Sequence, residues 1–253
     1  MNEAEKIKQA SRSAWAKIIK LQTYIEYNNR VVLSYECQEI LDSIFEGLNK
    51  GYPIETGTKL YRAQTGYEKV GLSYSPLSTD RMDAPDPEKA KGGRVSFSGI
   101  MCLYLATAWQ TALAEMRPWK GAYITLVPFV TVRELNLLDL TKNAIDSIVD
   151  INVRSISKLI SLNFSAPMED YEEHVKYIFT QYLTCIIKSK DYDGVAYDSY
   201  LDSQGKNIAL FDTASAQQLV REKKLYKTKK IEYVVEEDTP QFSNDSIEEM
   251  IGI

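Results

Sequence analysis

The chain has 253 residues, 44% of them hydrophobic and 26% charged, which is enough to bury a core and excludes disorder throughout. Its net charge is −5. Residues 236–253 hold six of the 35 acidic residues and no basic one, so the rest of the chain carries 30 basic and 29 acidic residues. This nearly neutral body lacks the positive field that attracts nucleic acids or anionic membranes, and we expect neither as a direct partner.

Cysteine and histidine are scarce in this sequence. The three cysteines, Cys37, Cys102 and Cys185, are widely spaced and form no CxxC pair, which argues against a disulfide framework or a structural zinc. The single histidine, His174, excludes a site built from several imidazoles, so no metal is expected. The N-terminus lacks a signal peptide, and no apolar run approaches the ~18 residues of a membrane span. These features predict a cytoplasmic protein.

Two amphipathic helices are predicted in the first fifty residues. Apolar residues recur at steps of three and four over residues 7–25, and the pattern repeats over residues 40–48. Gly51 and Pro53 then end the second helix. We expect residues 1–55 to form a helical extension that packs on the domain that follows.

Short strands and helices alternate from residue 56 onward without the regular rhythm of a doubly wound sheet, which favours an α+β fold. Thr107 and Gln110 have the spacing of a capping box, so a helix is predicted over 108–117. The segment 73–93 is rich in proline and glycine and is predicted to be a long surface loop of the kind that covers binding sites. Further helices are predicted over 144–160 and 171–187. Strands are predicted over 59–63, 95–98, 103–106, 123–129, 135–140, 195–197, 208–211 and 231–235.

Familiar catalytic spacings, such as GxGxxG, GxxxxGK[ST], HExxH and GxSxG, are absent. Three polar residues attract attention instead. Arg62 follows apolar residues in a predicted strand, where its planar fork suits a phosphate or, equally, a surface ion pair. Glu115 lies in a helix of small and apolar residues, where it faces either a cleft or solvent. Ser199 follows a predicted strand, where its hydroxyl bonds a ribose or phosphate or belongs to an ordinary turn.

Two further positions are ambiguous. Arg94 follows a pair of glycines, Gly92 and Gly93, which allow a close approach to an anion but also suit a turn into a strand. His174 lies beside the apolar stripe of its predicted helix and is interpreted as a packing residue rather than a catalyst.

Taken together, these positions resemble the RES-domain family, which is named for an arginine, a glutamate and a serine. Leu60-Tyr61-Arg62 resembles the arginine motif of that family, and Ala114-Glu115-Met116-Arg117 resembles its glutamate motif. Residues 193–199, followed by 207–211, resemble its serine motif. Residues 93–99 and 103–106 are similar to other parts of the family core. The resemblance covers roughly Thr56 to Val235 and occurs in the expected order.

The resemblance implies a fold like that of the ADP-ribosyltransferases, with short strands in a split sheet and flanking helices. It also implies a toxin that destroys NAD+ by phosphorolysis or hydrolysis and is paired with an Xre-like antitoxin. Two alternatives stay open: a mono-ADP-ribosyltransferase that modifies a protein, and a catalytically silent binding module. The implied domains are the helical extension 1–55, the catalytic domain 56–235 and a flexible acidic tail 236–253.

The resemblance also assigns the site. Arg62, Glu115 and Ser199 are the expected catalytic residues. Expected substrate contacts are Tyr61, Arg94 and Tyr104. No cofactor is expected, because NAD+ is the substrate and inorganic phosphate is a candidate co-substrate. The oligomeric state stays open.

Overall fold

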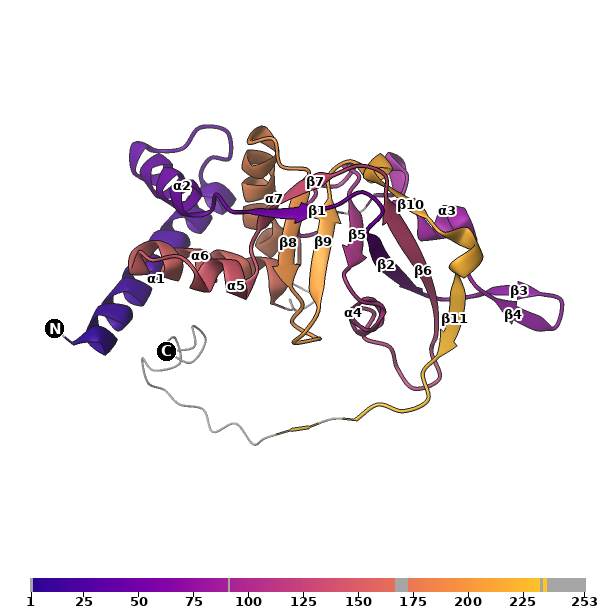
Figure 1. The fold of residues 1–253 in the computed structure, drawn as a ribbon. Helices are drawn as coiled ribbons and strands as arrows, with labels where there is room; N and C mark the ends of the chain where they lie inside the picture. Colours follow the sequence, from indigo (N-terminus) through magenta and orange to yellow (C-terminus); the bar gives the residue numbers. More distant parts are fainter. Residues whose placement is uncertain (1, 91, 167–172, 233, 236–253) are drawn as a thin grey trace.

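The computed structural model describes residues 2–90, 92–166, 173–232 and 234–235, and these form an α+β fold, as predicted (Figure 1). The helices are α1 (Glu3–Tyr27), α2 (Tyr35–Gly47), α3 (Thr79–Met82), α4 (Trp109–Ala114), α5 (Lys142–Asp146), α6 (Ile151–Ser165) and α7 (Glu173–Ser189). The strands are β1 (Gly51–Ile54), β2 (Lys59–Thr65), β3 (Glu68–Val70), β4 (Ser73–Ser75), β5 (Leu103–Ala106), β6 (Tyr123–Thr131), β7 (Leu135–Asp139), β8 (Gly194–Asp198), β9 (Lys206–Leu210), β10 (Ala216–Gln218) and β11 (Lys224–Lys227).

The main sheet is split near its middle. Within the described residues its strand order is β1-β7-β8-β9-β5-β2-β6-β10, and β11 also pairs with β6. Strands β2 and β6 pair continuously from Lys59 to Thr65, whereas β2 and β5 share the single register pair Tyr61 with Ala106. Because β2 and β5 are paired only at Tyr61 and Ala106, the two strands diverge beyond this pair. The space between them is lined by side chains rather than filled by backbone hydrogen bonds.

The predicted N-terminal helices are confirmed and cover one side of the sheet. Helix α1 begins with a capping box between Asn2 and Glu5, and its predicted apolar stripe is buried. It packs against α2, α6 and α7, as Figure 1 shows on the indigo side of the molecule. The segment Gly51–Ile54, which lies in the predicted extension, forms the edge strand β1 and pairs with β7. The extension is thus joined to the main sheet through its last residues.

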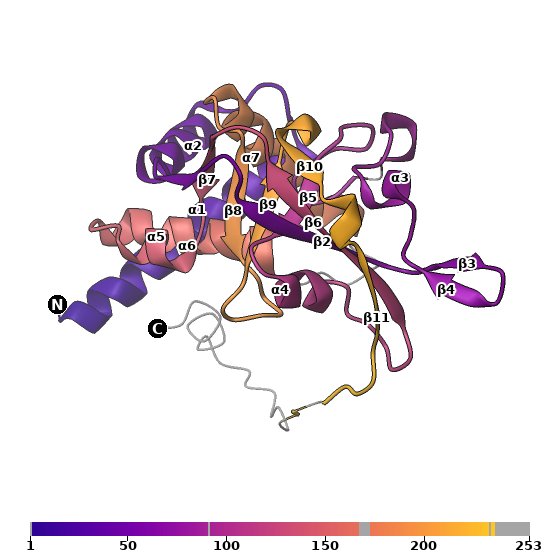
Figure 2. The same cartoon turned by 45° about the vertical axis from the view of Figure 1, so that its right-hand side comes forward.

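Three hydrophobic cores hold the sheet in shape. The first lies between the helices α1, α2, α6 and α7 and the strands β7 and β8. The second contains residues from strands on both sides of the split: Leu60, Leu103, Val127, Phe129, Leu137 and Ile208. The third lies under α4, which crosses β2, β5 and β6 (Figure 2): Ala63, Ala106, Ala112, Ile124 and Leu126.

The prediction of a strand over residues 95–98 is wrong. Its backbone is satisfied by side chains instead of a neighbouring strand. The Val95 N–H donates to the Tyr104 hydroxyl at 3.1 Å, and the Gln181 amide donates to the carbonyls of Gly93 and Ser96 at 2.8 and 3.1 Å. The predicted loop 73–93 is also more ordered than expected. It contains β4, α3 and a short 3-10 turn, and the hairpin β3–β4 projects from the body (Figure 1).

Other helices and strands begin or end at residues that differ from the predicted ones. The predicted strand 231–235 is wrong for its described residues, because β6 begins at Tyr123 and is already paired there with Lys227. The strand at this edge is β11 instead. The predicted helix 144–160 is two helices, and the second begins where the Asp150 side chain accepts two backbone N–H groups. The acidic tail 236–253 lies outside the described residues.

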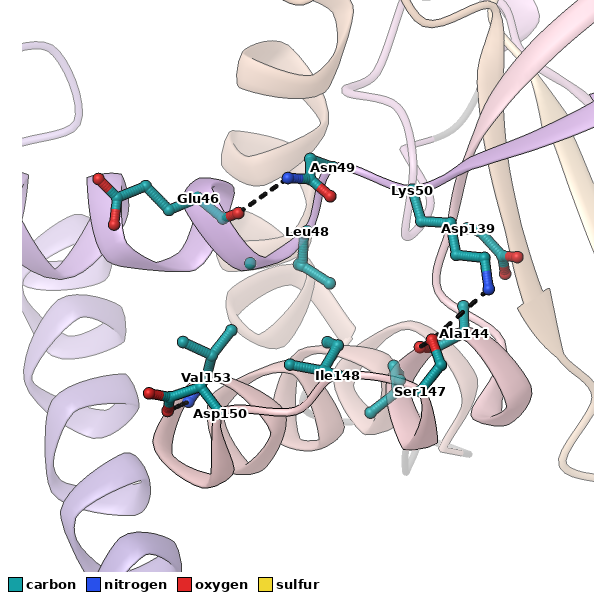
Figure 3. A pocket seen from close by; sticks show the side chains of 12 residues that line it. Glu46, Leu48, Asn49, Lys50, Asp139, Ala144, Ser147, Ile148, Asp150 and Val153 are labelled. Carbon is teal, nitrogen blue, oxygen red and sulfur yellow. Dashed lines mark hydrogen bonds between the residues drawn. The ribbon is translucent and has the colours of Figure 1, made fainter.

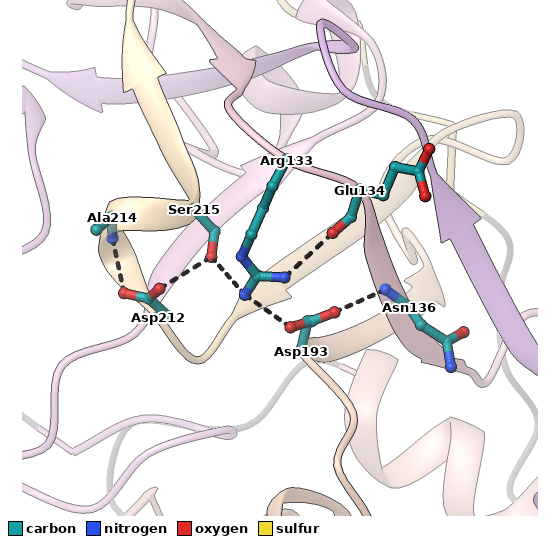
Figure 4. A network of polar contacts seen from close by, with 7 residues as sticks. All are labelled: Arg133, Glu134, Asn136, Asp193, Asp212, Ala214 and Ser215. Carbon is teal, nitrogen blue, oxygen red and sulfur yellow. Dashed lines mark hydrogen bonds and ion pairs between the residues drawn. The ribbon is translucent and has the colours of Figure 1, made fainter.

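An arginine clamps one end of the sheet, where β6 and β9 end and β7, β8 and β10 begin (Figure 4). Arg133 donates to the Ser215 hydroxyl and the Glu134 carbonyl, both at 3.1 Å, and forms an ion pair of 2.7 Å with Asp193. The other Asp193 carboxylate oxygen accepts the Asn136 N–H at 2.8 Å. Burial alone raises the pKa of Asp193, but the hydrogen bonds from Arg133 and the Asn136 N–H outweigh it and lower the pKa. The clamp joins the starts of β7 and β8 to the β9–β10 connection.

We predict that Arg133→Met lowers the free energy of unfolding by about 1–2 kcal/mol at neutral pH, because it removes charge-assisted hydrogen bonds from a partly exposed site. The lowered pKa of Asp193 means that this contribution is complete above about pH 4 and is lost as the pH falls further. The difference in melting temperature from the wild type should therefore shrink in acid. Arg221→Met, at an exposed arginine, is the control, and equal melting temperatures for the two variants at neutral pH would contradict the clamp.

Candidate active site

Arg62 lies on β2 beside the split in the sheet. Its Nη1 donates to the Tyr104 carbonyl of β5 at 3.0 Å, across the gap where the strands diverge. Its Nε is buried and has no hydrogen-bond partner. Burial lowers the pKa of the guanidinium, an effect that the nearby Asp83 opposes, but an arginine keeps its charge at any physiological pH. Arg62 therefore brings a partly buried positive charge to the split in the sheet.

Glu115 lies at the C-terminal end of α4, where its backbone N–H still donates to the Thr111 carbonyl at 3.0 Å. The helix is shorter than the predicted 108–117 and ends at Ala114. The predicted capping box is wrong, because the Thr107 hydroxyl bonds to the backbone of Lys206 instead. The early end of the helix places the Glu115 side chain over the β8–β9 turn.

The carboxylate of Glu115 is held by two donors. The Ser199 hydroxyl and the Asn207 side-chain amide each donate to the same carboxylate oxygen, Oε1, at 2.7 Å. No such bond holds the second oxygen, Oε2, in the described structure. Glu115 is thus fixed as an acceptor, with one oxygen directed at its partners and the other left for a ligand.

Ser199 is buried and donates to Glu115 from outside the cavity lining. Its Oγ accepts the backbone N–H groups of Leu201 and Asp202 at 3.2 and 3.1 Å, so the hydroxyl proton is left to point at Glu115. Asp202 in turn accepts a 2.6 Å bond from the Thr111 hydroxyl on α4. A Cβ on Gly205 would lie 2.0 Å from that hydroxyl, so only glycine lets the turn approach the helix this closely.

These groups surround a cavity of about 470 Å³ at the split. Three charged residues belong to its lining, Arg62 and Arg94 with positive charge and Glu115 with negative charge. The residues that line the cavity include Tyr61, Arg62, Gln64, Gly93, Arg94, Tyr104, Ala106, Glu115, Met116, Tyr177, Tyr197 and Asn207. A cavity with a fixed anion and a partly buried cation suits a ligand that carries a negative group and develops positive charge elsewhere.

Arg94 lines this cavity, but its guanidinium is engaged elsewhere. It donates to the Asn163 carbonyl at 3.2 Å and to the Ala166 carbonyl, and it lies 5.8 Å from the centre of the Tyr177 ring. These carbonyls end α6, so Arg94 caps the negative end of that helix. The predicted contact between Arg94 and a ligand would require it to leave or share these carbonyls.

Tyrosine side chains form much of the wall. Burial raises the pKa of Tyr104 and of Tyr197 well above the ordinary value, so both phenols stay protonated near neutral pH. Burial also raises the pKa of Cys102 to about 12, which leaves its thiol unreactive. Tyr104 and Tyr197 thus face the cavity as neutral phenols.

A larger cavity, about 600 Å³, lies between the end of α2 and helices α5 and α6 (Figure 3). Its charged lining is Glu46, Lys50, Asp139 and Asp150. The Lys50 ammonium reaches the Ser147 hydroxyl at 3.5 Å, and the Asp150 carboxylate caps the start of α6. Among the described residues, no buried side-chain atom without a hydrogen-bond partner belongs to this lining. We therefore place the candidate active site at the smaller cavity.

Within the described residues, no three histidine, cysteine, aspartate or glutamate side chains cluster so as to hold a metal ion. None of the described helices combines the length and hydropathy needed to cross a bilayer.

The structure brings five of the six predicted site residues to one cavity: Tyr61, Arg62, Arg94, Tyr104 and Glu115. Ser199 lies behind Glu115 rather than on the lining. Sequence reasoning missed Asn207, although it belongs to the stretch quoted for the serine motif. It also missed Tyr177, for which no spacing gave a signal. His174 belongs to α7, and its side chain lies outside the described part of the structure.

We predict that Ser199→Ala lowers the free energy of unfolding by about 1–2 kcal/mol, because two backbone N–H groups lose their acceptor in a buried turn. Ser203→Ala, an exposed serine in the same turn, is the matched control and should leave stability unchanged. Thermal melts of both variants make the comparison. Equal melting temperatures would show that the turn does not depend on the Ser199 hydroxyl.

The comparisons with known proteins identify the family. A family model described as the RES domain matches residues 59–235, which include Arg62, Glu115, Ser199 and Asn207. Neither curated proteins nor solved structures gave a match. The matched region covers most of the chain and the whole candidate site, and its α+β fold is ADP-ribosyltransferase-like, as predicted. The chain belongs to the RES domain family.

Proposed function

We propose that the protein is an NAD+-consuming enzyme that cleaves the bond between nicotinamide and ribose, as an NAD+ phosphorylase or an NAD+ glycohydrolase. The observation that carries the proposal is the Glu115 carboxylate, fixed by two 2.7 Å bonds in the same cavity as the partly buried Arg62. Membership of the RES domain family supports NAD+ as the substrate.

Cleavage breaks the bond between the nicotinamide nitrogen and ribose C1″. The bonding electron pair leaves with nicotinamide, which departs as a neutral molecule, and the ribose becomes oxocarbenium-like. An oxygen of phosphate or water then bonds to C1″ and gives ADP-ribose-1″-phosphate or ADP-ribose, with the surplus proton released to solvent. The second oxygen of Glu115 stabilises the positive ribose or holds its 2″-hydroxyl, and electrostatic terms of this kind are often the largest in catalysis.

Arg62 supplies the complementary charge. The guanidinium N–H groups that do not bind the Tyr104 carbonyl belong to a planar fork, and such a fork suits the diphosphate of NAD+ or an incoming phosphate. Tyr61 and Tyr104 offer aromatic faces for nicotinamide or adenine. The cavity of about 470 Å³ is in the range of small-molecule sites.

The biological setting that we propose is that of a cytoplasmic toxin controlled by an Xre-like antitoxin. We propose NAD+ itself as the substrate, with no further cofactor.

The direct test is to incubate the pure protein with NAD+, with and without inorganic phosphate, and to weigh the products by mass spectrometry. ADP-ribose-1″-phosphate that forms only with phosphate identifies a phosphorylase, and free ADP-ribose identifies a glycohydrolase. A mass gain on an added protein would make the chain a mono-ADP-ribosyltransferase. Unchanged NAD+ with a folded protein would contradict the proposal and favour a silent binding module.

We predict that Glu115→Gln lowers kcat by roughly 10²–10³, because it removes the negative charge opposite the positive ribose. The KM for NAD+ should change by only a few-fold, since the loss concerns the transition state. Glutamine keeps an oxygen that accepts from Ser199 and Asn207, so the fold should persist. Glu134→Gln, an exposed position at the Arg133 clamp, is the control. Wild-type turnover in Glu115→Gln would remove the carboxylate from the mechanism.

We predict that Arg62→Lys raises the KM for NAD+ by roughly 10–100-fold, because an ammonium keeps the charge but cannot bind a diphosphate with two parallel N–H groups. Initial rates over a range of NAD+ concentrations measure the effect, and Arg221→Lys at the surface serves as the control. Thermal melts establish that both variants are folded. An unchanged KM in Arg62→Lys would assign Arg62 to the Tyr104 contact alone.

A further inference from the structure

Asn207 sits at a place that the β8–β9 ladder determines. It is paired with Tyr197 in the register of these antiparallel strands, and the ladder continues one step further through the bond from the Ser199 N–H to the Gly205 carbonyl at 2.9 Å. Ser199 and Asn207 are therefore diagonal neighbours on one face of the two strands. Their side chains reach the same atom of Glu115 from this rigid platform.

The two donors, Ser199 and Asn207, share one oxygen of Glu115 and thereby fix the orientation of the carboxylate. A carboxylate oxygen has two lone pairs, and both lone pairs of Glu115 Oε1 are used by the Ser199 and Asn207 donors at 2.7 Å. With Ser199 alone, the carboxylate could turn about its last torsion and exchange its oxygens, since such torsions are broad. The second donor fixes the plane of the carboxylate and leaves Oε2 for the ligand.

We infer that Asn207 is a positioning residue for Glu115, which holds the carboxylate oriented toward the ribose of the substrate. This inference rests on the proposed function. Asn207 is one of the residues that line the cavity, and its backbone, on β9 between β8 and β5, remains in both ladders whatever its side chain. Its side-chain amide donates to Glu115 Oε1. Its side chain therefore acts on turnover through Glu115.

The competing interpretation is that Asn207 merely satisfies a polar group next to a partly buried carboxylate. Both interpretations allow its removal to reduce stability. They differ in the expected effect of Asn207→Asp. Aspartate has the size of asparagine, but it can donate a hydrogen bond only when it is protonated, and the experiment uses this pH dependence.

The experiment measures NAD+ consumption and thermal melts for Asn207→Leu and Asn207→Asp beside the wild type. Asn152→Leu and Asn152→Asp, at an exposed position on α6, are the matched controls. Asn207→Leu removes the donor, and we expect kcat to fall by roughly 10–100-fold with little change in KM, because a displaced catalytic group costs rate rather than affinity.

Asn207→Asp gives the sharper readout. At neutral pH it places two carboxylates in contact, which repel each other, so activity should be lower than in Asn207→Leu. In acid the pair shares a proton, and an O–H···O bond replaces the lost N–H···O bond. The pH optimum should then move toward acid by roughly one unit or more relative to the wild type.

Two results would overturn the inference: turnover of Asn207→Leu within two-fold of the wild type, or a pH profile of Asn207→Asp that is parallel to the wild-type profile. If Asn207→Leu is unfolded at the assay temperature, the pH profile of Asn207→Asp decides alone. Absence of NAD+ consumption by the wild type would contradict the proposed function instead, and it is seen before any variant is compared.

Discussion

The site depends on one weak point in the sheet, the single register pair Tyr61 with Ala106 between β2 and β5. A continuous ladder would bring the two strands to about 5 Å from one another and leave no room for a ligand. Residues from both halves share one core, so the halves are held together by hydrophobic burial where hydrogen bonds are missing. Arg62 reaches across the gap to the Tyr104 carbonyl, and the cavity opens beside that bond.

The negative charge of the site, on Glu115, comes from a different part of the fold. Helix α4 ends one residue before Glu115, and the tight approach of Gly205 to Thr111 fixes the helix against the β8–β9 turn. The turn then offers Ser199 and Asn207 to one oxygen of Glu115. Neither half of the sheet contains the site by itself. The fold places a hydrogen-bonded carboxylate and a partly buried arginine on one cavity by joining the two halves of the sheet.

The sequence predicted what depends on local pattern. The apolar stripe of residues 7–25 is α1, and the three motifs led to Arg62, Glu115 and Ser199. Features that depend on distant partners were missed. Residues 95–98 resemble a strand, but the Tyr104 hydroxyl and the Gln181 amide take the place of a neighbouring strand. Residues 231–235 alternate like a strand but lie beyond the start of β6. Asn207 meets Glu115 across 92 residues, a contact that no local spacing encodes.

The most direct test of the account is a crystal structure of the Glu115→Gln variant with NAD+ bound, since this change slows cleavage and leaves the cavity intact. The account predicts that the nicotinamide ribose lies within hydrogen-bond distance, about 2.6–3.2 Å, of the side chain at position 115, with the diphosphate at Arg62. NAD+ bound in the larger cavity beside α5 and α6, or with its ribose remote from position 115, would contradict the account.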